Sequence, residues 1–105
     1  MTYTGIDLVY LPEFRKQLRL GGDQLLKKAF NEAELDNREP IHLAGLWAAK
    51  EAVIKATGLK INNYRDIVIT YNKMGQPQAT VNMQKFAISI AHQGQYAVAV
   101  ATRNN

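Results

Sequence analysis

Trp47-Ala-Ala-Lys-Glu-Ala-Val53 is the stretch that decides the fold expected for this chain of 105 residues. It lies within an apolar run from Ile41 to Ala56 whose spacing and alanine content predict a long helix. From Leu43 onward, the charged residues of this run are Lys50, Glu51 and Lys55. A helix this apolar should be central to the domain, where an ionised side chain needs a partner.

Two of the charged residues of this helix are predicted to share one face. At about 100° per residue, Glu51 and Lys55 lie only about 40° apart. An anion and a cation that project together fit a site for a metal ion and a phosphate group. The alternative is an ordinary salt bridge between residues four positions apart. Lys50 points about 100° away from Glu51, so it is either structural or at the rim of such a site.

Asp7 is a further carboxylate in apolar surroundings. It lies in the segment from Thr2 to Leu11, whose alternation predicts a strand. One face of this strand carries Gly5, Asp7 and Val9, and the other carries Ile6, Leu8 and Tyr10. A charge at this position requires a lysine, a backbone donor or a metal ion as its partner. Together with Glu51, Asp7 suits Mg²⁺, which takes one or two carboxylates and completes its octahedron with water and phosphate oxygens.

The remaining pattern predicts an α+β domain. Pro12 opens a helix that continues from Glu13 to Leu20, Gly21-Gly22 breaks it, and a second short helix runs from Asp23 to Phe30. Asn31 and Glu34 have the form of a capping box, and the long helix follows from Glu39 to Thr57, closed by Gly58. Period-two segments then predict strands at Asp66–Tyr71, Gln78–Asn82, Phe86–Ala91 and Tyr96–Thr102. Strand, helices and strands in this order give one domain, 1–105, with an antiparallel sheet packed on a long central helix.

Composition narrows the classes of function. The absence of cysteine excludes disulfides, zinc–thiolate sites and a thiol nucleophile. No signal peptide or membrane-spanning segment is found, so we expect a cytoplasmic protein without a membrane partner. The net charge of +4 fits a nucleic acid, a phosphate-rich small molecule or an acidic protein as partner. No nucleic-acid signature accompanies the basic residues, which gather at Arg15, Lys16, Arg19, Lys27 and Lys28.

Four segments, in order, carry a resemblance that spans Tyr3 to Ala101. They are Gly5-Ile-Asp-Leu-Val9, Leu43-Ala-Gly-Leu-Trp-Ala-Ala-Lys-Glu-Ala-Val-Ile-Lys55, Met74-Gly-Gln-Pro77 and Ile88-Ser-Ile-Ala-His92. The series resembles the holo-acyl-carrier-protein synthase family, the small type of 4′-phosphopantetheinyl transferase. The Lys-Glu-Ala-x-x-Lys element is its most specific part.

The resemblance implies a role for each matching residue. Asp7 and Glu51 are expected to hold Mg²⁺, and Lys55 to contact a phosphate of coenzyme A. Glu51 and Lys55 are also the expected catalytic residues. The nucleotide end of coenzyme A is expected to contact Gly75, Pro77, Ser89 and His92. In a regular strand Ser89 and His92 face opposite sides, so a shared ligand requires a bend near His92. Ala91 stands where the family usually has a hydroxyl residue.

The implied reaction transfers 4′-phosphopantetheine from coenzyme A, as co-substrate, to a serine of an acidic acyl carrier protein and releases adenosine 3′,5′-bisphosphate. The family also implies a homotrimer with sites between neighbouring subunits. Two family arginines are absent, because Glu13 and Leu46 occupy their positions. A non-catalytic relative that binds coenzyme A or a nucleotide is therefore an alternative. A basic nucleic-acid-binding module is a third hypothesis, which rests on the charge alone.

Overall fold

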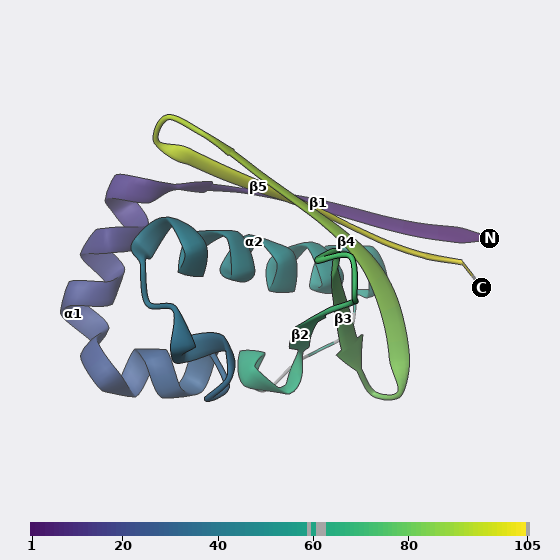
Figure 1. The fold of residues 1–105 in the computed structure, drawn as a ribbon, viewed down its shortest axis with the longest axis horizontal. Coiled ribbons are helices and arrows are strands. Elements are labelled where there is room, and N and C mark those ends of the chain that lie inside the picture. Colours follow the sequence, from purple (N-terminus) through teal and green to yellow (C-terminus); the bar gives the residue numbers. More distant parts are fainter. Residues whose placement is uncertain (59, 61–62, 105) are drawn as a thin grey trace.

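The predicted long helix and antiparallel sheet are both present in the computed structural model, which describes residues 1–58, 60 and 63–104 (Figure 1). The elements in chain order are β1 (Thr2–Tyr10), α1 (Leu11–Ala29), the 3₁₀ turn η1 (Glu34–Asp36), α2 (Pro40–Thr57), the 3₁₀ turn η2 (Tyr64–Asp66), β2 (Val68–Tyr71), β3 (Pro77–Val81), β4 (Gln84–Gln93) and β5 (Tyr96–Asn104). The fold class predicted from the sequence is confirmed.

The five strands form one sheet in the order β1-β5-β4-β3-β2, and each neighbouring pair is antiparallel. The strand nearest the start of the chain therefore pairs with the one nearest its end, with Thr2 opposite Asn104 and Asp7 opposite Ala99. Figure 1 shows α2 lying along the sheet and α1 at one end of the molecule. The buried side chains of the sheet and of α2 form one core.

Helix α2 lies so close to β1 that only glycine fits at position 5. A Cβ atom on Gly5 would lie 2.0 Å from the carbonyl oxygen of Ala52 and 2.7 Å from the nitrogen of Ala56. The helix presents small side chains to the sheet, and Ala48, Ala49 and Ala52 are fully buried. This close approach brings the charged face of α2 within reach of β1.

Helix α1 differs from the prediction. Instead of two helices separated by a break, one helix runs from Leu11 to Ala29 with a kink at Gly22, whose φ of 57° and ψ of −150° are not helical. The glycine pair was thus correctly identified as an interruption, but the helical turns continue directly on both sides. Helix α2 ends as predicted, at Gly58 with a left-handed φ of 66°.

Several strand boundaries differ from the predicted ones by one or two residues. Asp66 lies in η2 rather than in a strand, because the side chain of Asn63 accepts a hydrogen bond from the backbone of Arg65 and starts a 3₁₀ turn. Pro77 begins β3 instead of ending the loop. The predicted capping box at Asn31 and Glu34 is present, with both reciprocal bonds at 3.0 Å, and it leads into the short turn η1 ahead of α2. None of the described helices is long and apolar enough to cross a membrane.

The face of β1 that points away from α2 is apolar and exposed. Ile6 and Leu8 are 59% and 61% exposed. On β5 they lie opposite Val100 and Val98, which are only partly buried. A sheet face of this kind, continued over two strands, is a candidate surface for contact with another chain.

We predict that Gly5→Ala will destabilise the fold by about 3 kcal/mol, the upper part of the range for overpacking a core. The added methyl group meets backbone atoms of α2, which cannot rotate away as a side chain could. Urea denaturation followed by circular dichroism measures the change. Thr4→Ala, at an exposed position of the same strand, is the control. A stability equal to wild type would show that β1 can shift away from α2 at little cost.

Candidate active site

Asp7, Glu51 and Lys55 come together where α2 crosses β1. The Lys55 ammonium lies 2.8 Å from Oδ1 of Asp7, and the two residues form an ion pair. The side chain of Asp7 is only 14% exposed, whereas that of Lys55 is 54% exposed. Lys55 thus pairs across the helix–strand contact with Asp7, which is one of the partners considered for the Asp7 charge from the sequence. The cation was predicted to lie beside Glu51; among the described residues its ion pair is with Asp7, and no Glu51–Lys55 salt bridge is formed.

The charges of this cluster act on one another. The pKa of Lys55 is raised by its hydrogen bond to Asp7, by the charge of Asp7 and, to a smaller extent, by the charge of Glu51. The pKa of Tyr64 is raised to about 12 by burial first, then by a hydrogen bond to Glu51 and by the charges of Glu51 and Asp7. Four side chains from β1, α2 and η2 therefore form one electrostatic unit.

Tyr64 is a member of this cluster that the sequence pattern did not reveal. No element was predicted between Gly58 and Asp66, and nothing local connects a tyrosine there with Glu51. Its ring centroid lies 4.4 Å from that of Trp47. Trp47 in turn packs edge-on against Phe30, with centroids 6.5 Å apart. The aromatic residue in the Trp47–Val53 stretch is thus the contact that brings η2 back onto α2.

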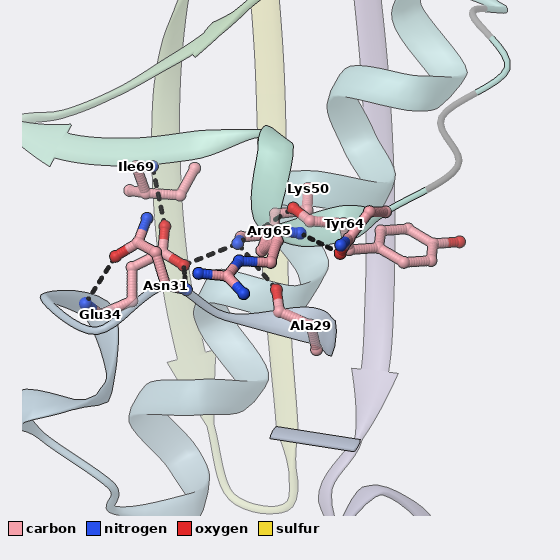
Figure 2. Close-up of polar contacts among 8 residues, drawn as sticks. Ala29, Asn31, Glu34, Lys50, Tyr64, Arg65 and Ile69 are labelled. Carbon is pink, nitrogen blue, oxygen red and sulfur yellow. Dashed lines mark hydrogen bonds and ion pairs between the residues drawn. The ribbon is translucent and has the colours of Figure 1, made fainter. Parts of the chain in front are cut away.

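Lys50 has the structural role that was one of its two predicted possibilities. Its ammonium group is completely buried and lies 2.6 Å from Oε1 of Glu34 (Figure 2). It also donates to the backbone oxygens of Ala29, at 2.8 Å, and Tyr64, at 3.2 Å. Burial lowers the pKa of Lys50, and the hydrogen bond and charge of Glu34 oppose that shift. The second oxygen of Glu34 accepts from the backbone of Ile69 at 2.8 Å.

The residues expected to bind the nucleotide end of coenzyme A form a separate group. Gly75, Pro77, Ser89 and His92 all line a cavity of about 890 Å³. Ser89 and His92 are three positions apart in β4, so a regular strand would place them on opposite faces. Both nevertheless line the same cavity. Two further groups with basic character, His42 and Lys85, also line it and were not predicted. Of the residues described, those that line this cavity do not include Asp7, Glu51 or Lys55.

The two positions that lack a family arginine lie in different surroundings. Glu13 is exposed in the first turn of α1. Leu46 is only 2% exposed and contributes to the wall of the cavity, one turn after His42. The cavity wall is therefore apolar where the resemblance leads one to expect a guanidinium group.

The carboxylate pair fits Mg²⁺ better than a transition metal. The described part of the chain holds no group of three or more histidine, cysteine, aspartate or glutamate side chains suited to a metal. Asp7 and Glu51 supply two carboxylates, with an ammonium group nearby. Carboxylates are hard oxygen ligands, which Mg²⁺ uses together with water and phosphate oxygens. The donor set agrees with a metal ion that shares its coordination with a phosphorylated substrate.

We predict that Lys50→Met will destabilise the protein by about 3–5 kcal/mol, because it leaves the Glu34 carboxylate buried without its cation. The double variant Glu34→Gln/Lys50→Met should regain part of this loss, since it removes both charges. Urea denaturation of the single and double variants measures the difference. If the double variant were as unstable as Lys50→Met, the cost would come from packing and not from the stranded charge.

Comparison with known proteins identifies the family of this chain. The chain matches the 4′-phosphopantetheinyl transferase superfamily over residues 3–101. It is 35% identical over 118 aligned positions to the holo-[acyl-carrier-protein] synthase of Verminephrobacter eiseniae, which covers 94% of this chain and 90% of that protein. The crystal structure of Helicobacter pylori holo-[acyl-carrier-protein] synthase in complex with coenzyme A gives a TM-score of 0.84 at 26% identity, over 93% of this chain and 96% of that one. The Bacillus anthracis synthase in complex with CoA (3′,5′-ADP) gives a TM-score of 0.80 at 27% identity, over 95% and 93% of the two chains. The chain therefore belongs to the 4′-phosphopantetheinyl transferase superfamily.

Proposed function

We propose that residues 1–105 form a single holo-acyl-carrier-protein synthase domain, which transfers 4′-phosphopantetheine from coenzyme A to a serine of an apo acyl carrier protein. The observation that carries this proposal is the meeting of Asp7 with Glu51 and Lys55, all within the matched residues. Relatives described as holo-acyl-carrier-protein synthases, some with coenzyme A bound, support it.

In the proposed reaction, the serine oxygen of the carrier protein forms a bond to the β-phosphorus of coenzyme A. The phosphorus–oxygen bond within the pyrophosphate breaks, and its electron pair leaves with adenosine 3′,5′-bisphosphate. Glu51 accepts the serine proton, directly or through a water molecule. The nucleophile belongs to the substrate, which is why the chain needs no nucleophilic residue of its own.

Lys55 and Asp7 have supporting roles. The Lys55 ammonium group is more than half exposed, so it can contact a phosphate of coenzyme A and stabilise the negative charge that develops there. Asp7 and Glu51 would hold Mg²⁺, which when bound would neutralise part of the pyrophosphate charge. The ion pair in the structure uses one oxygen of Asp7, Oδ1. Lys55 thus compensates the charge of Asp7.

The cavity beside β4 is the proposed site for the nucleotide end of coenzyme A. His42, Lys85 and His92 are its basic groups, and Ser89 adds a hydroxyl. Because this cavity and the Asp7 cluster are separate groups in one chain, we propose a homotrimer. Each site would take Asp7 and Glu51 from one subunit and the nucleotide contacts from its neighbour. The exposed apolar face around Ile6 and Leu8 supports this assembly.

The basic residues of α1 are the proposed docking surface for an acidic carrier protein. Arg15, Lys16 and Arg19 are all exposed on the first half of this helix. Complementary charge mainly accelerates association, so the effect should weaken as salt is raised. Glu13 reduces the positive charge at the start of this surface, and Arg15 lies two residues further along.

One observation favours the alternative, a non-catalytic relative that binds coenzyme A or a nucleotide. Leu46 places an apolar side chain in the cavity wall where the family commonly has an arginine. Incubating the protein with coenzyme A, Mg²⁺ and a panel of apo carrier proteins, and then weighing the carriers, separates the two hypotheses. A carrier heavier by one phosphopantetheine supports the synthase. Coenzyme A binding without any such product supports the alternative.

We predict that Glu51→Gln will lower the transfer rate at least about 100-fold, the lower end expected for removing a general base. The melting temperature should stay close to that of wild type, because Glu51 is only partly buried and glutamine keeps its shape. Single-turnover transfer and thermal unfolding are measured on the same samples. Glu32→Gln, an exposed glutamate of the η1 region, is the matched control. A folded Glu51→Gln protein with near-normal transfer would refute the assigned role.

We predict that the wild-type protein is a trimer and that Leu8→Glu converts it to monomers. Leu8 is 61% exposed, so the glutamate should not disturb the core of a single chain, whereas it would place a charge in an apolar interface. Light scattering gives the molar mass of both proteins. Leu20→Glu, at a 79% exposed leucine of α1, should remain trimeric. A wild-type monomer at micromolar concentration would contradict the proposed assembly.

A further inference from the structure

Part of the wall of the cavity beside β4 is formed by the hairpin of β2 and β3. The residues of this hairpin and its turn that line the cavity are all uncharged: Tyr71, Asn72, Gly75, Gln76, Pro77 and Gln78. The basic groups of the cavity, His42, Lys85 and His92, come from α2 and β4 instead, and no acidic side chain is among the described residues that line it. The hairpin wall therefore suits a neutral part of a ligand, and the basic groups suit its phosphates.

Tyr71 is the aromatic side chain of this hairpin wall. It lies two residues after the buried Ile69, so the two side chains are on the same face of β2. In the register of the hairpin, Tyr71 lies opposite Pro77, just as Ile69 lies opposite the buried Ala79. The face that belongs to the core at Ile69 and Ala79 thus becomes the cavity wall at Tyr71 and Pro77.

The ring of Tyr71 is accessible to a ligand. The residue is 51% exposed, although it lies on the core-facing side of the strand. Within the described part of the chain, its side chain has no hydrogen bond and no contact with another aromatic ring. Burial raises the pKa of Tyr71, and the charge of Glu34 adds to this shift, so the hydroxyl stays protonated. An uncharged aromatic face of this kind can pack on a planar group without repelling nearby phosphates.

The turn between Tyr71 and Pro77 is held by its own hydrogen bonds. Oδ1 of Asn72 accepts from the backbone nitrogens of Met74 and Gln76, each at 2.9 Å. The backbone nitrogen of Asn72 donates to the backbone oxygen of Gln76 at 3.0 Å. Tyr71 directly precedes Asn72, and Pro77 directly follows Gln76, so these bonds set the spacing of the two side chains before a ligand binds. Such preorganisation lowers the entropic cost of binding.

We propose that Tyr71, supported by Pro77, is the platform on which the adenine base of coenzyme A stacks. A planar base gains apolar contact on an aromatic ring and needs no charged partner for it. The basic groups of α2 and β4 remain for the phosphates of the same ligand. This role rests on the proposed synthase function, which supplies coenzyme A as the ligand. It makes Tyr71 a binding residue, remote from the atoms that react.

The test compares adenosine 3′,5′-bisphosphate with uridine 3′,5′-bisphosphate, which carry the same phosphates and differ only in the base. Tyr71→Leu should weaken binding of the adenosine compound about 10-fold in calorimetry, toward the lower end for the loss of one stacked base. Binding of the uridine compound should weaken by a smaller factor, because a pyrimidine offers less area for stacking. Tyr71→Phe keeps the ring and should bind both compounds as wild type does. Met83→Ala should also match wild type, since Met83 is 99% exposed and is not among the described residues of the cavity wall.

The ratio of the two affinities guards against a loss of folded protein. Unfolding would lower the apparent affinity for both compounds equally and leave their ratio unchanged. In the transfer reaction, Tyr71→Leu should raise KM for coenzyme A by a similar factor and leave kcat near that of wild type, as expected for a contact made equally before and during the reaction. An affinity ratio unchanged by Tyr71→Leu, or a Tyr71→Phe variant as weak as Tyr71→Leu, would overturn the stacking role.

The same measurements separate the stacking role from the proposed function. Suppose that wild type transfers no phosphopantetheine to any carrier, but Tyr71→Leu lowers its preference for the adenosine compound. The synthase proposal then fails and the stacking role stands. If wild type transfers normally and Tyr71→Leu binds both compounds as wild type does, the function stands and the stacking role fails.

Discussion

Burying an ammonium group without water is costly, and the irregular half of this structure is arranged around the acceptors that Lys50 requires. Ala29 supplies an oxygen from the end of α1, Glu34 a carboxylate from η1, and Tyr64 an oxygen from η2. Glu34 then reaches Ile69 at the start of β2. One side chain of α2 thus fixes segments that regular hydrogen bonding does not connect. The neighbouring residue on the same helix, Glu51, belongs to the candidate site.

The regular elements could be predicted because their signals are local. The alanine-rich run predicted α2 to within one residue at its start, and alternation predicted every strand that follows it. The meeting of Asp7 with Glu51 and Lys55 was expected from the resemblance, and the structure brings these residues together. The partners of Lys50 could not be predicted, since Glu34 is connected to it through a turn whose path no periodicity describes. Glu34 was recognised only as half of a capping box, which it also is.

Strand β1 shows why hydrophobicity alone misleads at this site. Its more apolar face, with Ile6 and Leu8, would be expected to cover the helix, yet the structure turns Gly5 and Asp7 toward α2. The reason is steric. The helix backbone approaches so closely that position 5 has no room for a side chain, and the next residue on that face can then meet Lys55. The larger side chains are left on the outside of the sheet, where a second chain could cover them.

The pairing of β1 with β5 has a consequence for how the protein is made. Asp7 lies opposite Ala99, so the sheet that holds it is closed by a strand distant in the sequence. Long-range strand pairing is slow compared with helix formation, because a large loop must close before the contacts form. On the ribosome, α1 and α2 can form well before β5 has been synthesised. The edge on which Asp7 sits is completed only after β5 has been synthesised, so the candidate site cannot be complete while only β1, α1 and α2 have formed.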